Sequence, residues 1–190
     1  MNEVALGPWQ WRALRRWKFL LAAMMTCLPV RSLTAQASPW TVRADRSEMT
    51  DQPLLLITQP SGRPISGVAG GSIRPLLFVR CREGVLSAGV AVAGLVPDRD
   101  SDSEVQVRVR WDDYPVVDVY WEVSDNLNVI WVPNELLWSF VYEGMVPANR
   151  LRLGIATYRQ GEVILEYSMA GFTQLVPRLQ ESCKGAMNLD

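Results

Sequence analysis

The 190 residues of this chain contain no histidine, so carboxylates and cysteines are the first side chains to consider for chemistry. Without histidine the chain cannot build a Ser-His-Asp triad, a Cys-His dyad, an HExxH zinc site or a histidine proton shuttle. A carboxylate-based hydrolase would need two acidic groups about 5–9.5 Å apart in one groove. No spacing in the sequence demands such a pair, so we expect no catalytic residues, no cofactor and no enzymatic activity.

One acidic segment has the spacing of a metal site. Asp98, Asp100 and Asp102 are spaced like the opening of an EF-hand calcium loop, but Ser103 and Val109 replace the glycine and glutamate that this loop requires. The three aspartates are therefore a weak calcium candidate, and the alternative is a solvated hairpin tip.

A second acidic pair, Asp112 and Asp113, could be considered for acid–base work. Adjacent residues of a strand face opposite sides of a sheet, so the two carboxylates would not share a substrate. The sequence Asp-Asp-Tyr-Pro is a turn signal. We therefore interpret this pair as turn residues.

The N-terminus is typical of a secretory signal peptide. Basic residues between Arg12 and Lys18 precede an apolar stretch at 19–30 and an A-x-A site at Ala35-Gln36-Ala37. We predict cleavage after Ala37, which leaves residues 38–190 as one exported domain. The alternatives are a twin-arginine signal, a lipoprotein signal or an uncleaved anchor, although a spanning helix needs about 20 apolar residues and Pro29 interrupts this stretch.

Cleavage would change the charge of the chain, whose net charge is −1. The first 37 residues hold five of the 19 basic residues and one of the 20 acidic ones, so the remainder has 14 basic and 19 acidic residues, a net charge of −5. Such a domain has no electrostatic reason to bind nucleic acid or an anionic membrane. No later stretch is long and apolar enough to span a bilayer, so we expect no membrane contact after cleavage.

Two cysteines remain after Cys27 leaves with the signal peptide. Cys81 and Cys183 form an even pair in an oxidising compartment, which favours a disulfide that closes a loop of about 100 residues. The alternative is two buried free thiols. Neither cysteine lies in a CxxC motif and no histidine could activate one, so thiol catalysis is not expected.

Short strands with short turns predict the elements that would position these groups. Apolar runs and period-two alternation mark strands at 54–57, 76–81, 85–95, 104–111, 116–121, 127–132, 151–158 and 162–169. The alternation is clearest at 104–111, and residues 60–75 are rich in glycine and proline and predict a loop. Such strands pair mostly antiparallel.

Two helices are predicted among these strands. Residues 134–143 follow Pro133, with Asn134 as the expected N-cap. An apolar stripe from Phe172 to Cys183 has helical spacing, and Pro177 should kink this helix or mark its first turn. We therefore predict a β-rich α+β domain, an antiparallel β-sandwich or a curved sheet with two short covering helices.

Two kinds of side chain are candidates for binding a partner. Arg108 and Arg110 share the polar face of one predicted strand and could meet an acidic partner, unless that face is merely solvated. The predicted mature chain also has five tryptophans, which would suit a glycan- or peptidoglycan-binding module if they were exposed and coplanar, although most tryptophans pack in cores.

Several segments, taken in order, resemble the VasI (TagO) family of exported proteins associated with type VI secretion systems. They are Trp40, the S-x-M-x-D segment Ser47 to Asp51, the strand Arg74 to Cys81 ending in Arg-Cys, the strand Val107 to Asp112, the turn with Trp121, Ser124 and Asp125, and the closing helix with Gly171, Phe172, Leu175, Leu179 and Cys183.

This resemblance implies a location and a role. The location is the periplasm of a Gram-negative bacterium, and the role is that of a non-catalytic accessory protein that binds envelope or secretion-apparatus proteins. The family has no established catalytic residues to carry over. The resemblance adds Trp121, Ser124 and Asp125 to Arg108 and Arg110 as candidate partner-binding residues. The sequence does not fix the oligomeric state.

Overall fold

The computed structural model describes residues 38–92 and 94–184, so the predicted signal peptide lies outside the described residues. The described residues contain eleven strands: β1 (Thr41–Arg46), β2 (Pro53–Pro60), β3 (Ile65–Ser66), β4 (Ser72–Ile73), β5 (Leu76–Arg82), β6 (Val85–Ala91), β7 (Glu104–Trp111), β8 (Val117–Val123), β9 (Val129–Trp131), β10 (Arg150–Thr157) and β11 (Gly161–Ser168). Their helices are α2 (Asn134–Trp138), a π-helix (Ser139–Met145), a 3₁₀ turn (Thr173–Leu175) and α3 (Val176–Ser182).

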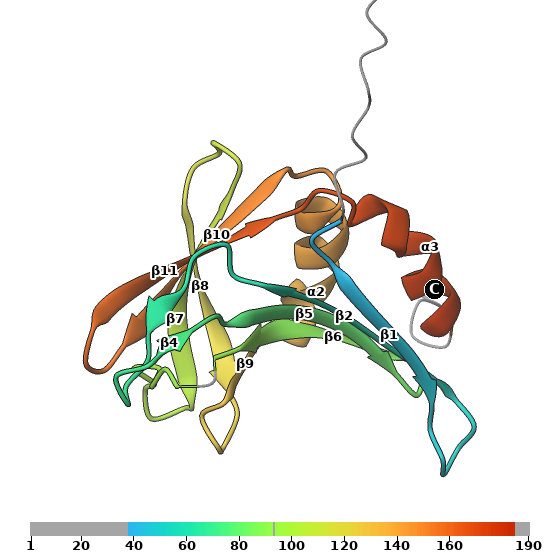
Figure 1. Cartoon of the computed structure of the whole chain (residues 1–190), viewed down its shortest axis with the longest axis horizontal. Helices are drawn as coiled ribbons and strands as arrows, with labels where there is room; N and C mark the ends of the chain where they lie inside the picture. The colour runs from blue at the N-terminus through green and yellow to red at the C-terminus, as the bar shows by residue number, and fades with distance from the viewer. Residues whose placement is uncertain (1–37, 93, 185–190) are drawn as a thin grey trace, which may run out of the picture. The chain divides into compact units, whose positions relative to one another are not determined.

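Nine of these strands form one antiparallel sheet in the order β1-β2-β5-β6-β9-β8-β7-β10-β11. The sheet is strongly curved, and α2 and α3 lie on one side of its β2–β5–β6 part (Figure 1). Its two halves join through the short strand β9, which pairs with only three residues of β6 and two of β8. The predicted fold class is confirmed, and the architecture is the curved sheet with two short helices.

Side-chain alternation decides which face of the sheet is buried. On β7, Val105, Val107 and Val109 are buried while Gln106 and Arg108 are exposed, as the period-two pattern predicts. The buried sides of the strands meet in one hydrophobic core, which the two helical segments cover.

The helices differ from their predicted form at their ends. Pro133, not Asn134, occupies the N-cap position of α2, and no side chain caps this helix, so the predicted N-cap is wrong by one residue. After one turn the helix widens into the π-helix, which buries Phe140 and Met145. In the closing segment Pro177 lies in the first turn of α3, where its missing N–H is not needed.

Three strand predictions also need correction. Strand β1 was not predicted, because its sequence is polar and only Val42 is even half-buried. The predicted loop at 60–75 contains the small β3–β4 hairpin. The strand predicted at 85–95 ends at Ala91, and the chain turns there, with the Leu95 N–H donating to the Val92 carbonyl at 2.7 Å.

The disulfide between Cys81 and Cys183 is present and joins β5 to the residue that follows α3, with the two Cα atoms 5.6 Å apart. Both cysteines are buried. The predicted pairing is confirmed, and disulfides are typical of proteins in oxidising compartments. Within the described part of the chain, no helix is both long enough and apolar enough to cross a membrane.

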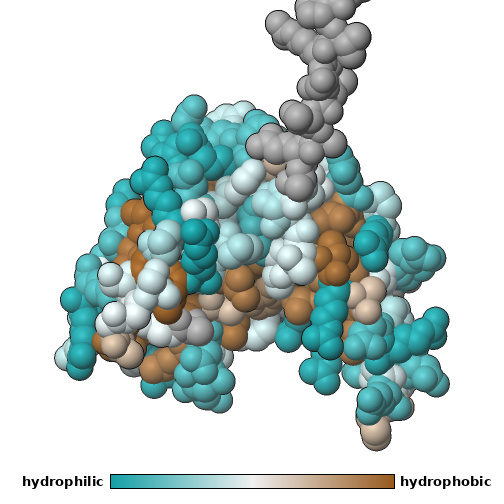
Figure 2. Space-filling view, in the orientation of Figure 1, coloured by the Kyte–Doolittle hydropathy of each residue, from teal (hydrophilic) through white to brown (hydrophobic). Residues whose placement is uncertain are grey.

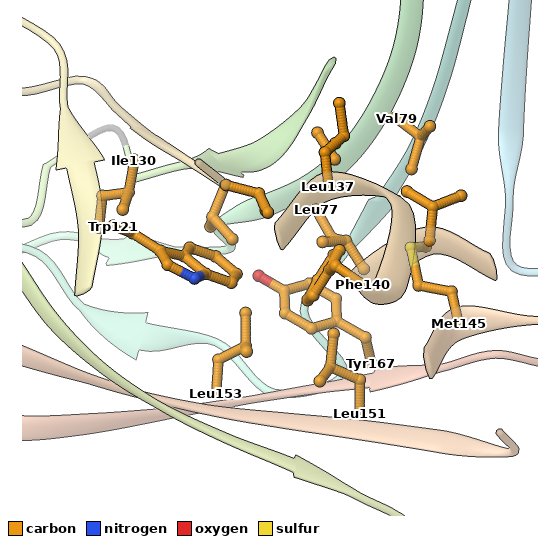
Figure 3. Packing of buried hydrophobic residues seen from close by; sticks show 14 of the residues in the cluster. Leu77, Val79, Trp121, Ile130, Leu137, Phe140, Met145, Leu151, Leu153 and Tyr167 are labelled. Carbon is orange, nitrogen blue, oxygen red and sulfur yellow. The ribbon is translucent and has the colours of Figure 1, made fainter. Parts of the chain in front are cut away.

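The centre of the core is aromatic. Trp121 from β8, Tyr167 from β11 and Phe140 from the π-helix point toward one another (Figure 3), and the rings of Trp121 and Phe140 meet edge-on with centroids 5.2 Å apart. The Tyr167 hydroxyl donates a hydrogen bond to the Pro75 carbonyl at 3.3 Å, which satisfies its buried polar group. Burial raises the pKa of Tyr167 well above its ordinary value of about 10.

This buried tyrosine should make the protein lose stability in alkali. Above pH 10 the unfolded chain releases the Tyr167 proton while the folded chain keeps it, so folding is opposed by up to about 1.4 kcal/mol per pH unit. The variant Tyr167→Phe should show a shallower fall in the free energy of unfolding between pH 10 and 11. Urea unfolding at each pH measures the slope, with exposed Tyr158→Phe as the control. Identical slopes for the two variants would contradict this account.

A glycine in the π-helix makes room for a second tryptophan. A Cβ atom on Gly144 would collide with the indole of Trp111, which itself packs on Phe140 with ring centroids 5.2 Å apart. The variant Gly144→Ala should therefore lower the free energy of unfolding by about 1–3 kcal/mol. Gly71→Ala is the matched control, because a Cβ there meets nothing within 4 Å. Equal unfolding midpoints in urea for both variants would show that the indole moves aside freely.

Candidate functional site

The acidic residues considered for chemistry are held in local hydrogen bonds. The Asp100 carboxylate accepts the backbone N–H groups of Asp102 and Glu104, both at 3.0 Å, and so closes the turn before β7. Asp98 is exposed. Among the described residues no three acidic or cysteine side chains gather where they could hold a metal ion, so the calcium candidate at Asp98, Asp100 and Asp102 is not supported.

Asp112 and Asp113 stabilise the turn between β7 and β8. Asp112 has a positive φ of 43°, and its carboxylate accepts the backbone N–H groups of Asn149 at 3.1 Å and Arg150 at 2.8 Å. Asp113 pairs with Arg150 at 3.2 Å and with Arg152 at 3.5 Å. These contacts give both carboxylates a role in joining the β7–β8 turn to the start of β10.

Removing the Asp112 carboxylate should loosen this junction. Asp112→Ala leaves two backbone N–H groups without their acceptor, and we expect a loss of about 1–2 kcal/mol in the free energy of unfolding. Asp112→Asn should retain most of the stability, because its amide oxygen is an acceptor and asparagine tolerates positive φ. Thermal unfolding of the two variants compares them, and an alanine variant as stable as the asparagine variant would refute the capping role.

The predicted partner-binding arginines of β7 are engaged within the sheet. Arg108 pairs with Asp118 at 3.4 Å and with Glu162 at 3.3 Å. Glu162 crosses β10 over Gly154, where any Cβ would collide with its carboxylate. The Arg110 Nε–H donates to the Tyr114 carbonyl at 3.1 Å. Both arginines remain partly exposed, but the charge of Arg108 is neutralised by two carboxylates.

Trp121 cannot be a partner contact, and this part of the prediction is wrong. Its side chain is only 1% exposed and packs in the core. Ser124 and Asp125 lie in the β8–β9 turn, where the Ser124 hydroxyl donates to the Asn126 side-chain oxygen at 2.9 Å and accepts the Val129 N–H at 3.0 Å. Asp125 is exposed. The predicted set is therefore not one site: the arginines and the turn are surface features, and the tryptophan is internal.

The five tryptophans that the structure describes do not form the coplanar exposed strip that a glycan-binding module would need. Trp40 and Trp121 are buried, and Trp111 and Trp131 are half-buried. Trp138 on α2 is 44% exposed and packs against Tyr142 of the π-helix, with ring centroids 4.1 Å apart. One exposed indole is a small surface for sugar stacking.

A different surface combines exposed arginines with apolar side chains. Cys81 on β5 faces α3, so alternation places its neighbours Arg80 and Arg82 on the opposite, helix-free side of the sheet. The register brings them level with outward residues of the neighbouring strands. We call this surface the arginine face and define it by Arg43, Leu54, Leu56, Arg80, Arg82 and Trp131.

The arginine face holds its central side chain firmly. The Arg80 Nε–H donates to the Ser87 hydroxyl at 2.8 Å, and its guanidinium carbon lies 4.6 Å from the centre of the Trp131 ring. Trp131 in turn meets Phe78 edge-on at 5.2 Å. Partial burial, and then the nearby charge of Arg82, lower the pKa of Arg80. The cation is therefore both partly desolvated and fixed in position over an aromatic ring.

The arginine face is not apparent from the sequence alone. The signal was present in part, since residues 80 and 82 alternate with a cysteine expected to face the interior. The missing information was the strand order, which sets Leu54 and Leu56 of β2 beside these arginines and places Trp131 of β9 under Arg80.

Comparisons with known proteins add little to this geometry. No family model matches the chain, and no curated protein matches it in sequence. Among solved structures it is similar to the crystal structure of invasion associated protein B from Bartonella henselae, at 15% sequence identity and a TM-score of 0.46, over 80% of this chain and 99% of that chain. Membership of the VasI family thus stays a prediction.

Proposed function

We propose that this chain is a non-catalytic, exported accessory protein that acts by binding other proteins of the cell envelope. The observation that carries the proposal is the arginine face, on which exposed Arg43, Leu56 and Arg82 lie beside half-buried Leu54 and Arg80 on the helix-free side of the sheet. Exposed apolar side chains grouped with arginine are typical of protein-binding surfaces. The signal-peptide pattern and the disulfide support an oxidising compartment outside the cytoplasm.

The proposed location and partners follow from the resemblance of the sequence to the VasI family. A VasI-like protein would work in the periplasm beside a type VI-like secretion apparatus, so its partners would be subunits of that apparatus or other envelope proteins. Of the acidic residues considered for chemistry, Asp100 and Asp112 bind backbone N–H groups of turns and Asp113 is ion-paired, which favours a binding role over catalysis.

Capture from intact envelopes tests this function. The tagged full-length chain is produced in a Gram-negative host, crosslinked in the envelope and purified, and both the bound proteins and the bound muropeptides are identified. We expect secretion-apparatus or other envelope proteins that are absent from a capture with an unrelated tagged periplasmic protein. Muropeptides without any protein would instead support the glycan-binding alternative. An eluate that contains neither would refute a partner-binding role.

A further inference from the structure

The arginine face carries cations that the chain does not neutralise. Among the described residues, no carboxylate lies within ion-pair distance of Arg80 or Arg82, whereas Arg108 on the other half of the sheet has two. Asp45 on β1 lies on the same face, level with Leu54, and pairs with Arg43 at 3.9 Å. An arginine that is partly desolvated and lacks an anion is unfavourable in isolation, and a bound carboxylate would relieve this cost.

The surface around these cations is hollowed and combines charged with apolar side chains. A depression of about 290 Å³ is lined by Arg43, Leu54, Leu56, Arg80 and Arg82, together with Asp45. Leu56 is 37% exposed, and Val85 on the neighbouring strand β6 is 63% exposed. The outline of the molecule is indented below β5 and β6, between the β8–β9 turn and the β1–β2 hairpin (Figures 1 and 2). The depression is large enough for a few side chains but not for a folded domain.

We propose that the arginine face binds an extended acidic segment of a protein partner, with carboxylates on Arg80 and Arg82 and an apolar side chain between Leu54 and Leu56. This inference rests on the proposed partner-binding function and names the chemistry of the segment that is bound. Charge complementarity selects a carboxylate ligand, because arginine binds carboxylates through two parallel hydrogen bonds. The leucines select a peptide over a polyanion, since nucleic-acid binding needs many phosphate contacts and a basic surface.

A peptide titration tests the inference directly. The probe is a fluorescent peptide of alternating glutamate and leucine, and the comparison probe has glutamine in place of glutamate. With the purified exported protein, fluorescence anisotropy should show binding of the acidic peptide that weakens as salt is added. Arg80→Gln combined with Arg82→Gln should weaken it by about tenfold or more. Arg82→Gln alone should weaken it by several-fold while leaving the fold intact, because Arg82 is exposed and its side chain makes no hydrogen bond or ion pair within the described residues.

The matched control removes the same charge elsewhere. Arg63 and Arg159 are exposed and lie off the arginine face, so Arg63→Gln combined with Arg159→Gln should leave the affinity within about twofold of the wild type. Equal affinities of the two double variants, equal binding of both peptides, or no binding of the acidic peptide would overturn the inference. Binding of muropeptides, single-stranded DNA or anionic vesicles in its place would overturn it as well.

The two proposals can fail separately. If the same envelope proteins are captured by the wild type and by the Arg80→Gln, Arg82→Gln variant, partner binding stands and the acidic-segment inference is wrong. If the wild type captures no envelope protein at all, the proposed function itself is wrong, whatever the peptide titration shows.

Discussion

Removing the disulfide should cost the protein about 4–5 kcal/mol of unfolding free energy, a large fraction of the roughly 5–15 kcal/mol that stabilises an ordinary domain. The bond joins residues 102 positions apart, and its removal frees the unfolded chain to adopt many more conformations. The variant is Cys81→Ala with Cys183→Ala, because alanine leaves no buried hydroxyl or thiol behind. Equilibrium urea unfolding gives the free energy of unfolding for the variant and for the oxidised wild type.

Reductant provides the internal control for this prediction. The wild type should move to the midpoint of the variant when it is unfolded and refolded with reductant, and the variant should not respond. A wild type that is insensitive to reductant and as stable as the variant would show that the bond contributes nothing.

The same variant should loosen α3 first. This helix has seven residues and no side-chain N-cap, and an isolated helix of this length is unstable in water. Leu179 and Cys183 are the buried residues that fasten it to the sheet. Without the bond, amide hydrogens of residues 176–182 should exchange faster than those of β5. Unchanged exchange in α3 would mean that the burial of Leu179 is sufficient to hold it.

Strands in which apolar and polar residues alternate could be predicted from the sequence. Strands that form only because they pair with another strand could not. Residues 104–111 reveal their buried face through three valines at every second position, and the structure places them there. β1 has no such pattern, because it is an edge strand with one half-buried residue, Val42, and it exists through its pairing with β2. Charged residues on an edge strand also discourage pairing with other chains.

The helical segments show a second limit. A helix was predicted for residues 134–143, but no pattern in the sequence indicates that it widens into a π-helix at Ser139. Within the π-helix, Phe140 packs against two tryptophans and Gly144 lies directly against Trp111. Such tertiary packing overrides local propensity and is invisible to periodicity.

The candidate binding surface could not be predicted either, because it depends on contacts between strands that are distant in the sequence. Arg108 and Arg110 were predicted as partner-binding residues because they share one face of a strand. That shared face is a local property of the sequence. Whether a surface arginine is free depends on what the neighbouring strands bring beside it. Glu162 and Asp118 reach Arg108 from β11 and β8, while no carboxylate of the described residues reaches Arg82 on β5. Long-range register thus decides which arginines can bind a partner.

Trp121 provides the sharpest test of the distinction between core and surface aromatics. Its side chain is among the largest that are fully buried, and Trp121→Ala should lower the free energy of unfolding by about 3–5 kcal/mol through lost packing and a residual cavity. Trp138→Ala is the matched control, since it removes the same atoms from a side chain that is 44% exposed, and it should cost about 1 kcal/mol or less.

The difference in stability between Trp121→Ala and Trp138→Ala also decides how a loss of partner binding in Trp121→Ala is interpreted. If Trp121→Ala unfolds at a much lower urea concentration than Trp138→Ala, any loss of partner binding in the first variant reflects loss of the fold. Trp121→Phe keeps an aromatic ring beside Phe140 and should recover part of the stability, which a surface contact would not require. If both alanine variants were equally stable and only Trp121→Ala lost its partner, Trp121 would be a binding residue and the packing of this core would be wrong.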